Sequence, residues 1–527
     1  MSWTVSIFLR ILAIFKNFFG FGNKITNAEK YNAIIVGAGA AGITAAVKLQ
    51  TSGFHNWVIL EKLDEVGGTW AINKYPGLSC DIVSHVFSFS YFLNPNWSKL
   101  TSPRQEIQEY LYKIATSFRI FPRIRFNTEV LEVIWLENKW HVRLSTGEVL
   151  KANFLIGATG LYLFPSKPKI EGLDTFLGES VHTAEWSDEI CLKDKSVAVI
   201  GTGATSVQLI PTIAPKVKNL FVYQRTPSWI MHRENYEYST FMKLCFRFVP
   251  GFLKIYRWKH VLKREFMYQQ AASYPGKDES GKEKFSSIYQ ELKNELVNEA
   301  KSILKDPVLE AKLIPDYAIL CKRIGVSDMY LQAFKRKNVH LITDRILSIT
   351  ETGIKTEPND QKPSNPGAIK LDLIIFATGF DVMKSTVSPF KMQGRNGIDI
   401  IEAWKGYPKA MYGVTAPGFP NFFKIFGPNT ATCHSSNWSI IESGVNYTVD
   451  CIRKTCAREA VFVEMKRDSM NGYYEWLKTK LDKVVHSSGC LSYYLNANGE
   501  NFLLWPGTTL SYWWITLVCD LENYFLY

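Results

Sequence analysis

Two glycine-rich segments of the same design constrain the fold of this chain more than any other feature. One covers residues 31–62 and reads YNAIIVGAGAAGITAAVKLQTSGFHNWVILEK, and the other covers residues 195–227 and reads KSVAVIGTGATSVQLIPTIAPKVKNLFVYQRTP. Each places an apolar run before a glycine-rich turn, followed by a helix-like segment and a second apolar run. That order is typical of a βαβ unit, in which a helix joins two parallel strands. The sequence therefore predicts an α/β fold with two Rossmann-like dinucleotide-binding domains.

The first turn contains Gly37, Gly39 and Gly42, which form a GxGxxG pattern. The first glycine permits a tight turn, the second a close approach of a pyrophosphate, and the third close packing of the helix. The phosphates would then lie at the amino end of that helix. Glu61 ends the second apolar run, where a carboxylate accepts hydrogen bonds from ribose hydroxyls. The first unit is therefore predicted to bind a dinucleotide with a free ribose.

The second turn keeps Gly201 and Gly203 but has Ser206 in the place of the third glycine, where a small residue can still pack. Arg225 lies 24 residues after Gly201, the same offset that separates the acid of the first unit from its first glycine. A guanidinium can bind a 2′-phosphate bidentately, whereas a carboxylate would repel it. The second unit is therefore predicted to bind NADPH, and the alternative is an exposed surface arginine.

Two further apolar runs end in Ala-Thr-Gly, at residues 154–160 and 371–381, where the chain should cross between the two domains. Residues from about 231 to 320 lack strand alternation and carry charged, helix-forming sequence, so they are predicted to be a helical insertion. The predicted organisation is an apolar N-terminal segment (1–27), the first part of the first nucleotide domain (28–160), the NADPH domain with its insertion (161–384) and the second part of the first domain (385–527).

The composition is that of an ordinary globular protein with a basic balance. The chain has 61 Lys and Arg against 49 Asp and Glu, a formal charge of +12, and no nucleic-acid-binding motif, so nucleic acid is not expected as a partner. Its nine cysteines are an odd number without framework spacing, which indicates a reducing, cytoplasmic compartment. Cys451 and Cys456 resemble a redox pair but are interpreted as ordinary thiols.

The N-terminal segment is strongly apolar but is interrupted by Arg10 and Lys16. It therefore lacks the uninterrupted run of ~20 residues that a membrane span requires. Its apolar residues recur at helical spacing: Ile7, Ile11, Ile14, Phe15 and Phe18. Such a helix suits the membrane interface, where it would attach the protein to the cytoplasmic face, and the alternative is a helix packed on the protein body.

Two longer motifs resemble those of the type I Baeyer–Villiger monooxygenases, which are class B flavin-dependent monooxygenases. The family fingerprint FxGxxxHxxxW is matched by Phe176, Gly178, His182 and Trp186, although Ser187 stands where Pro or Asp usually follows. The second motif, [AG]GxWxxxx[FY]P[GM]xxxD, is matched throughout residues 67–81 by GGTWAINKYPGLSCD. The resemblance extends from about residue 31 to about residue 506.

The resemblance implies FAD at the first nucleotide unit and NADPH at the second. It assigns Lys62, Thr69, Trp70, Asp81 and Val130 to FAD, in addition to the residues of the first turn and Glu61. It assigns Thr202, Thr205, Thr226 and Lys322 to NADPH, with Arg225 and the second turn. Arg323 is implied to be the catalytic cation that stabilises an anionic C4a-peroxyflavin, and Asp81 is implied to hold Arg323 in position.

The activity implied is insertion of one oxygen atom of O2 next to a ketone carbonyl, which gives an ester or a lactone. The alternative is oxidation of N or S heteroatoms, which the departure at Ser187 favours slightly. A non-catalytic flavoprotein redox sensor is a third hypothesis, but such a protein would have no need for both Asp81 and Arg323. The resemblance places the FxGxxxHxxxW fingerprint in a linker between the nucleotide domains, where its His and Trp would maintain domain geometry.

Overall fold

The computed structural model describes residues 10, 24–232, 235–274, 276, 284–357 and 368–527. The predicted interfacial helix in residues 1–27 lies almost entirely outside this part of the chain. Among the described residues, no helix combines the length and apolarity needed to cross a membrane.

The first nucleotide domain is built on a five-stranded parallel sheet with the strand order β19-β7-β1-β2-β3. Its strands are β1 (Ala33–Val36), β2 (Trp57–Leu60), β3 (Ile124–Arg125), β7 (Phe154–Gly157) and β19 (Phe422–Lys424). Every residue of β1 and β7 is buried, as expected of a parallel sheet covered on both faces. Helix α2 (Ala40–Thr51) joins β1 to β2 and packs against the long helix α13 (Asn437–Ala457).

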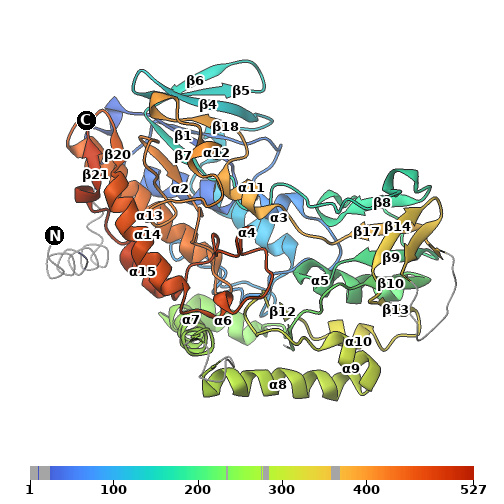
Figure 1. Cartoon of the computed structure of the whole chain (residues 1–527). Helices are drawn as coiled ribbons and strands as arrows, with labels where there is room; N and C mark the ends of the chain where they lie inside the picture. Colours follow the sequence, from blue (N-terminus) through green and yellow to red (C-terminus); the bar gives the residue numbers. More distant parts are fainter. Residues whose placement is uncertain (1–9, 11–23, 233–234, 275, 277–283, 358–367) are drawn as a thin grey trace.

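A four-stranded sheet covers the other side of this domain, at the top of Figure 1. It contains β4 (Val130–Leu136), β5 (Lys139–Leu144), β6 (Val149–Ala152) and β18 (Lys391–Gln393). Buried side chains of β4 and β5, including Trp135 and Trp140, share one apolar cluster with Leu155 of β7. This cluster fixes the distance between the two sheets.

The second nucleotide domain has its own five-stranded parallel sheet with the order β13-β10-β9-β17-β8, at the right of Figure 1. Its strands are β8 (Glu179–His182), β9 (Ser196–Ile200), β10 (Asn219–Tyr223), β13 (Val339–Ile342) and β17 (Leu373–Phe376). Helix α5 (Ala204–Ile213) joins β9 to β10 in the same way that α2 joins β1 to β2. A three-stranded sheet lies at the edge of this domain and contains β14 (Ile346–Thr350), β15 (Gly353–Thr356) and β16 (Ile369–Lys370).

The helical insertion begins and ends at a two-stranded parallel pair, β11 (Ile230–Met231) and β12 (Gly325–Val326). Between them lie α6 (Thr240–Phe248), α7 (Phe252–Ala271), α8 (Ser287–Leu304) and α9 (Pro307–Leu313), at the bottom of Figure 1. The other helices labelled in Figure 1 are α3 (Thr69–Ile72), α4 (Arg104–Ser117), α10 (Tyr330–Ala333), α11 (Val382–Val387), α12 (Ile400–Ala403), α14 (Arg467–Leu481) and α15 (Thr509–Ile515). Strands β20 (Val463–Met465) and β21 (Tyr524–Leu526) form a separate antiparallel pair.

The predicted α/β class, with two Rossmann-like domains and a helical insertion, is confirmed. The chain leaves the first domain after β7 and returns to it after β17. Each of these two crossings begins with one of the Ala-Thr-Gly segments. The core of each domain is a separate apolar cluster, because each sheet is covered by its own helices.

One buried charge stands out in the first sheet. Lys424 is the last residue of β19 and is only 4% exposed, and its Nζ is 3.5 Å from the carbonyl oxygen of Ser385. Burial lowers the pKa of Lys424 from 10.5 to about 8. Below pH 8 the amine is charged in both the folded and the unfolded chain, so the folded state then bears the full cost of desolvation.

We predict that Lys424→Met stabilises the protein at pH 7 by about 3 kcal/mol, because a shift of this size costs roughly 1.4 kcal/mol for each pKa unit. Between pH 8 and 10.5 the unfolded chain binds a proton at this position that the folded chain does not, so wild-type stability should rise with pH. The advantage of the variant should therefore shrink over that range. Thermal unfolding of both proteins at pH 7 and pH 10 measures this, and an equal difference at both pH values would contradict it.

Candidate active site

The two predicted nucleotide turns have the same construction. Gly37 and Gly201 both follow the first strand of their unit, with φ of 106° and 113°. A Cβ atom on Gly37 would lie 2.7 Å from the carbonyl oxygen of Ala158, and one on Gly201 would lie 2.5 Å from that of Ala377. Ala158 and Ala377 begin the two Ala-Thr-Gly segments. Each domain crossover therefore packs directly against a turn that only glycine can form.

The first turn is open toward the amino end of α2. Gly39 is the residue before α2, and Gly42 lies within its first turn. The predicted FAD residue Thr69 begins α3, immediately after Gly68, whose Cα lies close to Gly39. Trp70 follows, and its carbonyl oxygen accepts a 2.8 Å hydrogen bond from Nε of Arg104. The GGTW segment is thus held beside the glycine-rich turn.

Glu61 closes the other side of this turn. It is buried directly after β2, and its Oε2 accepts a 2.6 Å hydrogen bond from the backbone N–H of Ala38. Its Oε1 accepts a second hydrogen bond, of 2.9 Å, from the N–H of Leu63. Lys62 is exposed beside it, and Val130 is buried at the start of β4 in the same apolar cluster as Leu60. All the predicted FAD residues except Asp81 thus surround the carboxyl ends of β1 and β2.

The second turn is more open than the first. Gly203 is exposed, and Thr205 and Ser206 lie in the first turn of α5. The hydroxyl of Thr202 donates a 2.8 Å hydrogen bond to the carbonyl oxygen of Thr226, which ties the turn to the residues that follow β10. Ser206 is buried at the position where Gly42 stands in the first unit.

Two basic side chains meet beside this second turn. Arg225 is exposed after the end of β10, and Lys322 comes from the end of the helical insertion. The Lys322 ammonium lies 4.8 Å from the centre of the Tyr317 ring, and burial together with the Arg225 guanidinium lowers the pKa of Lys322. Within the part of the chain that the structure describes, neither side chain forms an ion pair. Two neighbouring cations of this kind fit a bound phosphate.

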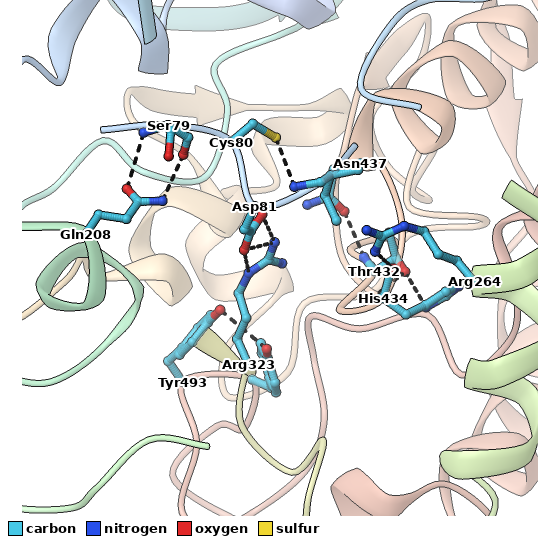
Figure 2. A network of polar contacts seen from close by, with 12 residues as sticks. Ser79, Cys80, Asp81, Gln208, Arg264, Arg323, Thr432, His434, Asn437 and Tyr493 are labelled. Atoms are coloured by element: carbon cyan, nitrogen blue, oxygen red, sulfur yellow. Dashed lines mark hydrogen bonds and ion pairs between the residues drawn. The ribbon is translucent and has the colours of Figure 1, made fainter. Parts of the chain in front are cut away.

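The predicted catalytic pair is formed. Arg323 donates from Nε to Oδ2 of Asp81 at 2.8 Å and from Nη2 to both carboxylate oxygens at 2.6 Å. The side chains are only 21% and 18% exposed (Figure 2). Burial alone would raise the pKa of Asp81, but the Arg323 guanidinium lowers it below its ordinary value. Burial would likewise lower the pKa of Arg323, but Asp81 raises it well above its ordinary value. Both groups are therefore charged across the physiological pH range.

A second polar cluster lies beside Asp81 in Figure 2, where Arg264 of α7 approaches Thr432 and His434. Arg264 donates a 3.0 Å hydrogen bond to the carbonyl oxygen of His434. The neighbouring Glu265 is buried, lies 3.3 Å from the His434 ring and accepts a hydrogen bond from the N–H of Thr509. The His434 ring also stacks on Tyr268 at 3.7 Å. Sequence reasoning missed this cluster, because its members are far apart in the chain and match no motif.

The segment that ends at Asp81 also joins the two domains. Gln208 of α5 accepts a 3.1 Å hydrogen bond from the Tyr75 hydroxyl and donates one of 2.9 Å to the carbonyl oxygen of Ser79. A Cβ atom on Gly77 would lie 2.6 Å from the carbonyl oxygen of Gln208. The sequence Tyr75-Pro76-Gly77 thus allows α5 of the second domain to approach the first. Gln208 carried no sequence signal for this contact.

Residues 34–244 match the family model for pyridine nucleotide-disulphide oxidoreductases. The chain is 34% identical over 500 residues to a Baeyer–Villiger monooxygenase of Streptomyces coelicolor, covering 94% of this chain and 92% of the relative. It is also 34% identical to a Baeyer–Villiger monooxygenase of Pseudomonas aeruginosa, covering 95% and 92%.

The chain belongs to the Baeyer–Villiger monooxygenase family.

Solved structures agree with this assignment. The cyclohexanone monooxygenase of Rhodococcus sp. Phi1, bound to NADP⁺, superposes with a TM-score of 0.81 at 26% identity and covers 94% of this chain and 99% of that one. An oxidised steroid monooxygenase bound to NADP has a TM-score of 0.79 at 26% identity, with the same coverage. As a member of this family, the chain is an NADPH-dependent flavin monooxygenase. The residues around the first turn fit FAD, and those around the second turn fit NADPH.

The family fingerprint lies at the edge of the second sheet and not in a free linker. Phe176 precedes β8 and packs partly buried against that sheet, and a Cβ atom on Gly178 would lie 2.7 Å from the carbonyl oxygen of Asp372. His182 ends β8, is fully buried, and lies 5.7 Å from the Phe380 ring in the returning crossover. Trp186 is buried in the core of the second domain. The fingerprint thus connects the sheet edge to the segment that returns to the first domain.

The cysteines differ from expectation at one pair. Cys321 and Cys490 form a disulfide, with Cα atoms 6.3 Å apart, which the expectation of a reducing compartment did not include. The bond joins the residue before Lys322 and Arg323 to the segment that carries Tyr493. Irregular spacing gave no indication of it, because only the fold brings the two residues together. Cys451 and Cys456 are free and buried, as predicted.

We predict that Arg225→Ala lowers the preference for NADPH over NADH by about 10- to 150-fold, because it removes a charge-assisted hydrogen bond to the 2′-phosphate worth roughly 1.5–3 kcal/mol. The measurement is kcat/KM for each cofactor. Arg336→Ala is the matched control, since Arg336 is an exposed arginine elsewhere in the same domain. A wild-type enzyme that uses both cofactors equally well would contradict the assignment of Arg225.

Proposed function

We propose that this protein uses FAD and NADPH to insert one oxygen atom of dioxygen next to the carbonyl of a ketone, giving an ester or a lactone. NADPH would supply two electrons, and the second oxygen atom would leave as water. The observation that carries the proposal is the ion pair of Asp81 and Arg323, whose side chains are only 18% and 21% exposed, in a chain 34% identical to named Baeyer–Villiger monooxygenases.

FAD, when bound and reduced, supplies the chemistry that activates dioxygen. We assign its pyrophosphate to Gly37, Gly39 and Gly42 at the amino end of α2, where backbone N–H groups and the helix dipole favour an anion. Glu61 would accept hydrogen bonds from its ribose hydroxyls. The glycine cradle supports this assignment, since a Cβ atom on Gly42 would lie within 1.8 Å of the carbonyl oxygen of Gly37.

Arg323 would stabilise the negative charge that develops on oxygen next to the ketone. A guanidinium is charged at every working pH and presents several N–H donors in a fixed plane. Asp81 holds Nε and Nη2 and leaves Nη1 as the remaining donor group for the reacting atoms, among the contacts that the structure describes. A preorganised cation in a site shielded from water is effective because no solvent has to reorganise when the charge forms.

The arrangement favours ketone oxygenation over the oxidation of N or S heteroatoms. Attack on a carbonyl needs an anionic oxygen nucleophile, and a permanently charged, half-buried arginine favours the anionic form. Oxidation of a soft heteroatom needs a protonated oxygen instead. The relatives with the highest printed identity carry the Baeyer–Villiger name, whereas only Ser187 favoured the alternative.

We predict that Arg323→Ala retains FAD but loses ester formation by ~100- to 1000-fold, the usual cost of removing a preorganised electrostatic donor. Arg323→Lys should recover part of the activity, because it restores the charge without the planar group. Ester product and NADPH consumption are measured together for each variant, with flavin absorbance as the check on folding. Because Arg323→Ala leaves the Asp81 carboxylate without this partner, the double variant Asp81→Asn, Arg323→Ala separates loss of chemistry from destabilisation.

If Arg323→Ala forms ester at the wild-type rate per NADPH consumed, Arg323 is structural and another residue must stabilise the oxygen. If sulfides and amines are oxygenated by the wild type while a panel of ketones is not, the proposed reaction is wrong.

We also propose that the protein works in the cytoplasm and that its N-terminal segment contacts the membrane surface. The apolar residues at helical spacing between positions 7 and 18 support this hypothesis. Within the described residues, Arg10 donates a hydrogen bond to the carbonyl oxygen of Trp514, and its guanidinium lies 5.9 Å from the centre of the Trp514 ring. Ile25 is buried, and its N–H donates a 2.7 Å hydrogen bond to the carbonyl oxygen of Ser52.

We predict that deletion of residues 1–23, which removes the Arg10 contact but keeps the packed chain from Ile25 onward, lowers the share of protein in the membrane fraction while flavin reduction by NADPH is unchanged. Fractionation of cell extracts by centrifugation measures the shift. Full-length protein that is already in the soluble fraction would contradict this function of the segment.

A further inference from the structure

Helices α6 and α7 expose apolar side chains on the side that faces solvent. On α6 these are Phe241 (73% exposed), Leu244 and Phe248 (68%), which recur at spacings of three and four residues. The spacing places them in one stripe along the helix. The opposite side of α6 is anchored by Phe246, which is buried in the core of the first domain.

Helix α7 carries a second stripe of the same kind. Ile255 (69% exposed), Trp258, Leu262 and Phe266 (62%) recur at spacings of three, four and four residues. The other side of α7 is buried through Val261 and Tyr268, so the helix is apolar on both sides. A surface helix of a globular protein normally has polar residues on its solvent side. An apolar surface of this length, on two consecutive helices, marks an interaction site.

Basic residues flank the stripe and acidic residues are missing from it. Arg247, Lys254, Lys259 and Lys263 are exposed on the same two helices. The sequence from 240 to 264 contains no Asp or Glu. The next acidic residue, Glu265, points inward and binds His434 and Thr509. The solvent side of α6 and α7 is therefore both apolar and positively charged.

We propose that α6 and α7 form a docking surface for an anionic phospholipid bilayer. Aromatic and aliphatic residues flanked by Lys and Arg are the composition of helices that lie in the membrane interface, where apolar groups enter the acyl boundary and the cations contact phosphates. The formal charge of +12 acts in the same direction. None of the described helices can span a membrane, so attachment through this surface is peripheral.

The charge pattern argues against a second copy of the chain as the occupant. In a two-fold symmetric dimer the same patch meets itself, so Lys254, Lys259 and Lys263 would face their own copies without acidic partners. A bilayer that contains anionic lipids supplies the missing negative charge.

The docking surface and the active site share helix α7. Its solvent side carries the apolar stripe, and its inner side carries Arg264, which is hydrogen-bonded to the carbonyl oxygen of His434 in the polar cluster beside Asp81. Arg257 of the same helix donates 3.1 Å hydrogen bonds to the carbonyl oxygens of His85 and Ser88 in the first domain. A bilayer bound to α6 and α7 would therefore lie against a helix that is fixed to the site, and the inference rests on the exposed surface, independently of the proposed reaction.

The test is flotation of the full-length, flavin-loaded protein with vesicles of phosphatidylcholine alone or with roughly one third phosphatidylserine. The wild type should float with the anionic vesicles and less with the neutral ones. The variant Phe248→Gln, Ile255→Gln, Trp258→Gln, Phe266→Gln should reduce partitioning by about 100-fold or more, because four apolar side chains no longer leave water. The variant Lys254→Gln, Lys259→Gln, Lys263→Gln should lose the preference for phosphatidylserine.

The matched control is Val308→Gln with Ile401→Gln, which replaces exposed apolar residues on helices α9 and α12 and should float like the wild type. All variants keep the N-terminal segment, so loss of flotation reports on α6 and α7 and not on residues 1–23. Flavin content and NADPH oxidation show that each variant is folded.

Flotation of the four-residue variant at the wild-type level overturns the proposal. It is also overturned if the wild type does not float but elutes as a dimer that this variant converts to a monomer, since the surface is then a contact between copies of the chain.

Discussion

The salt bridge between Asp81 and Arg323 is the interaction on which the rest of the site depends. Two charges that are mostly removed from water are tolerated only when they meet in good geometry, and here three N–H···O contacts of 2.6–2.8 Å provide it. Asp81 belongs to the first domain, and Arg323 lies at the end of the insertion of the second, just before β12. The pair can form only when both domains are in place, so it couples the geometry of the site to the geometry of the whole chain.

The elements around this pair explain how that geometry is maintained. Gln208 of α5 binds the segment that leads to Asp81, while the Cys321–Cys490 disulfide holds the segment that leads to Arg323. The two domain crossovers pack against Gly37 and Gly201 through the carbonyl oxygens of two equivalent alanines. A change in the relative orientation of the domains would therefore alter the contacts at both nucleotide turns and at the catalytic pair together.

The basic side chains of the molecule form three groups, and each group has a different proposed function. Arg225 and Lys322 lie beside the second turn and suit a 2′-phosphate, whereas Arg323 is committed to Asp81. A third group of cations lies on α6 and α7 among exposed apolar side chains, in a stretch from 240 to 264 that contains no Asp or Glu. The basic balance of the chain thus has local explanations, and none of them requires nucleic acid.

The sequence by itself determined the fold class, the two nucleotide units and the partners Asp81 and Arg323, because glycine spacing, strand apolarity and the family motifs are local properties of the chain. It could not place the fingerprint, since the position of His182 at a sheet edge depends on the pairing of β8 with β17. Nor could it indicate the Cys321–Cys490 bond or the Glu265–His434 contact, whose members are brought together only by packing. Tertiary structure also decided which side of α7 faces solvent. Both sides of that helix are apolar, so periodicity alone does not distinguish the side that the core buries from the side left exposed.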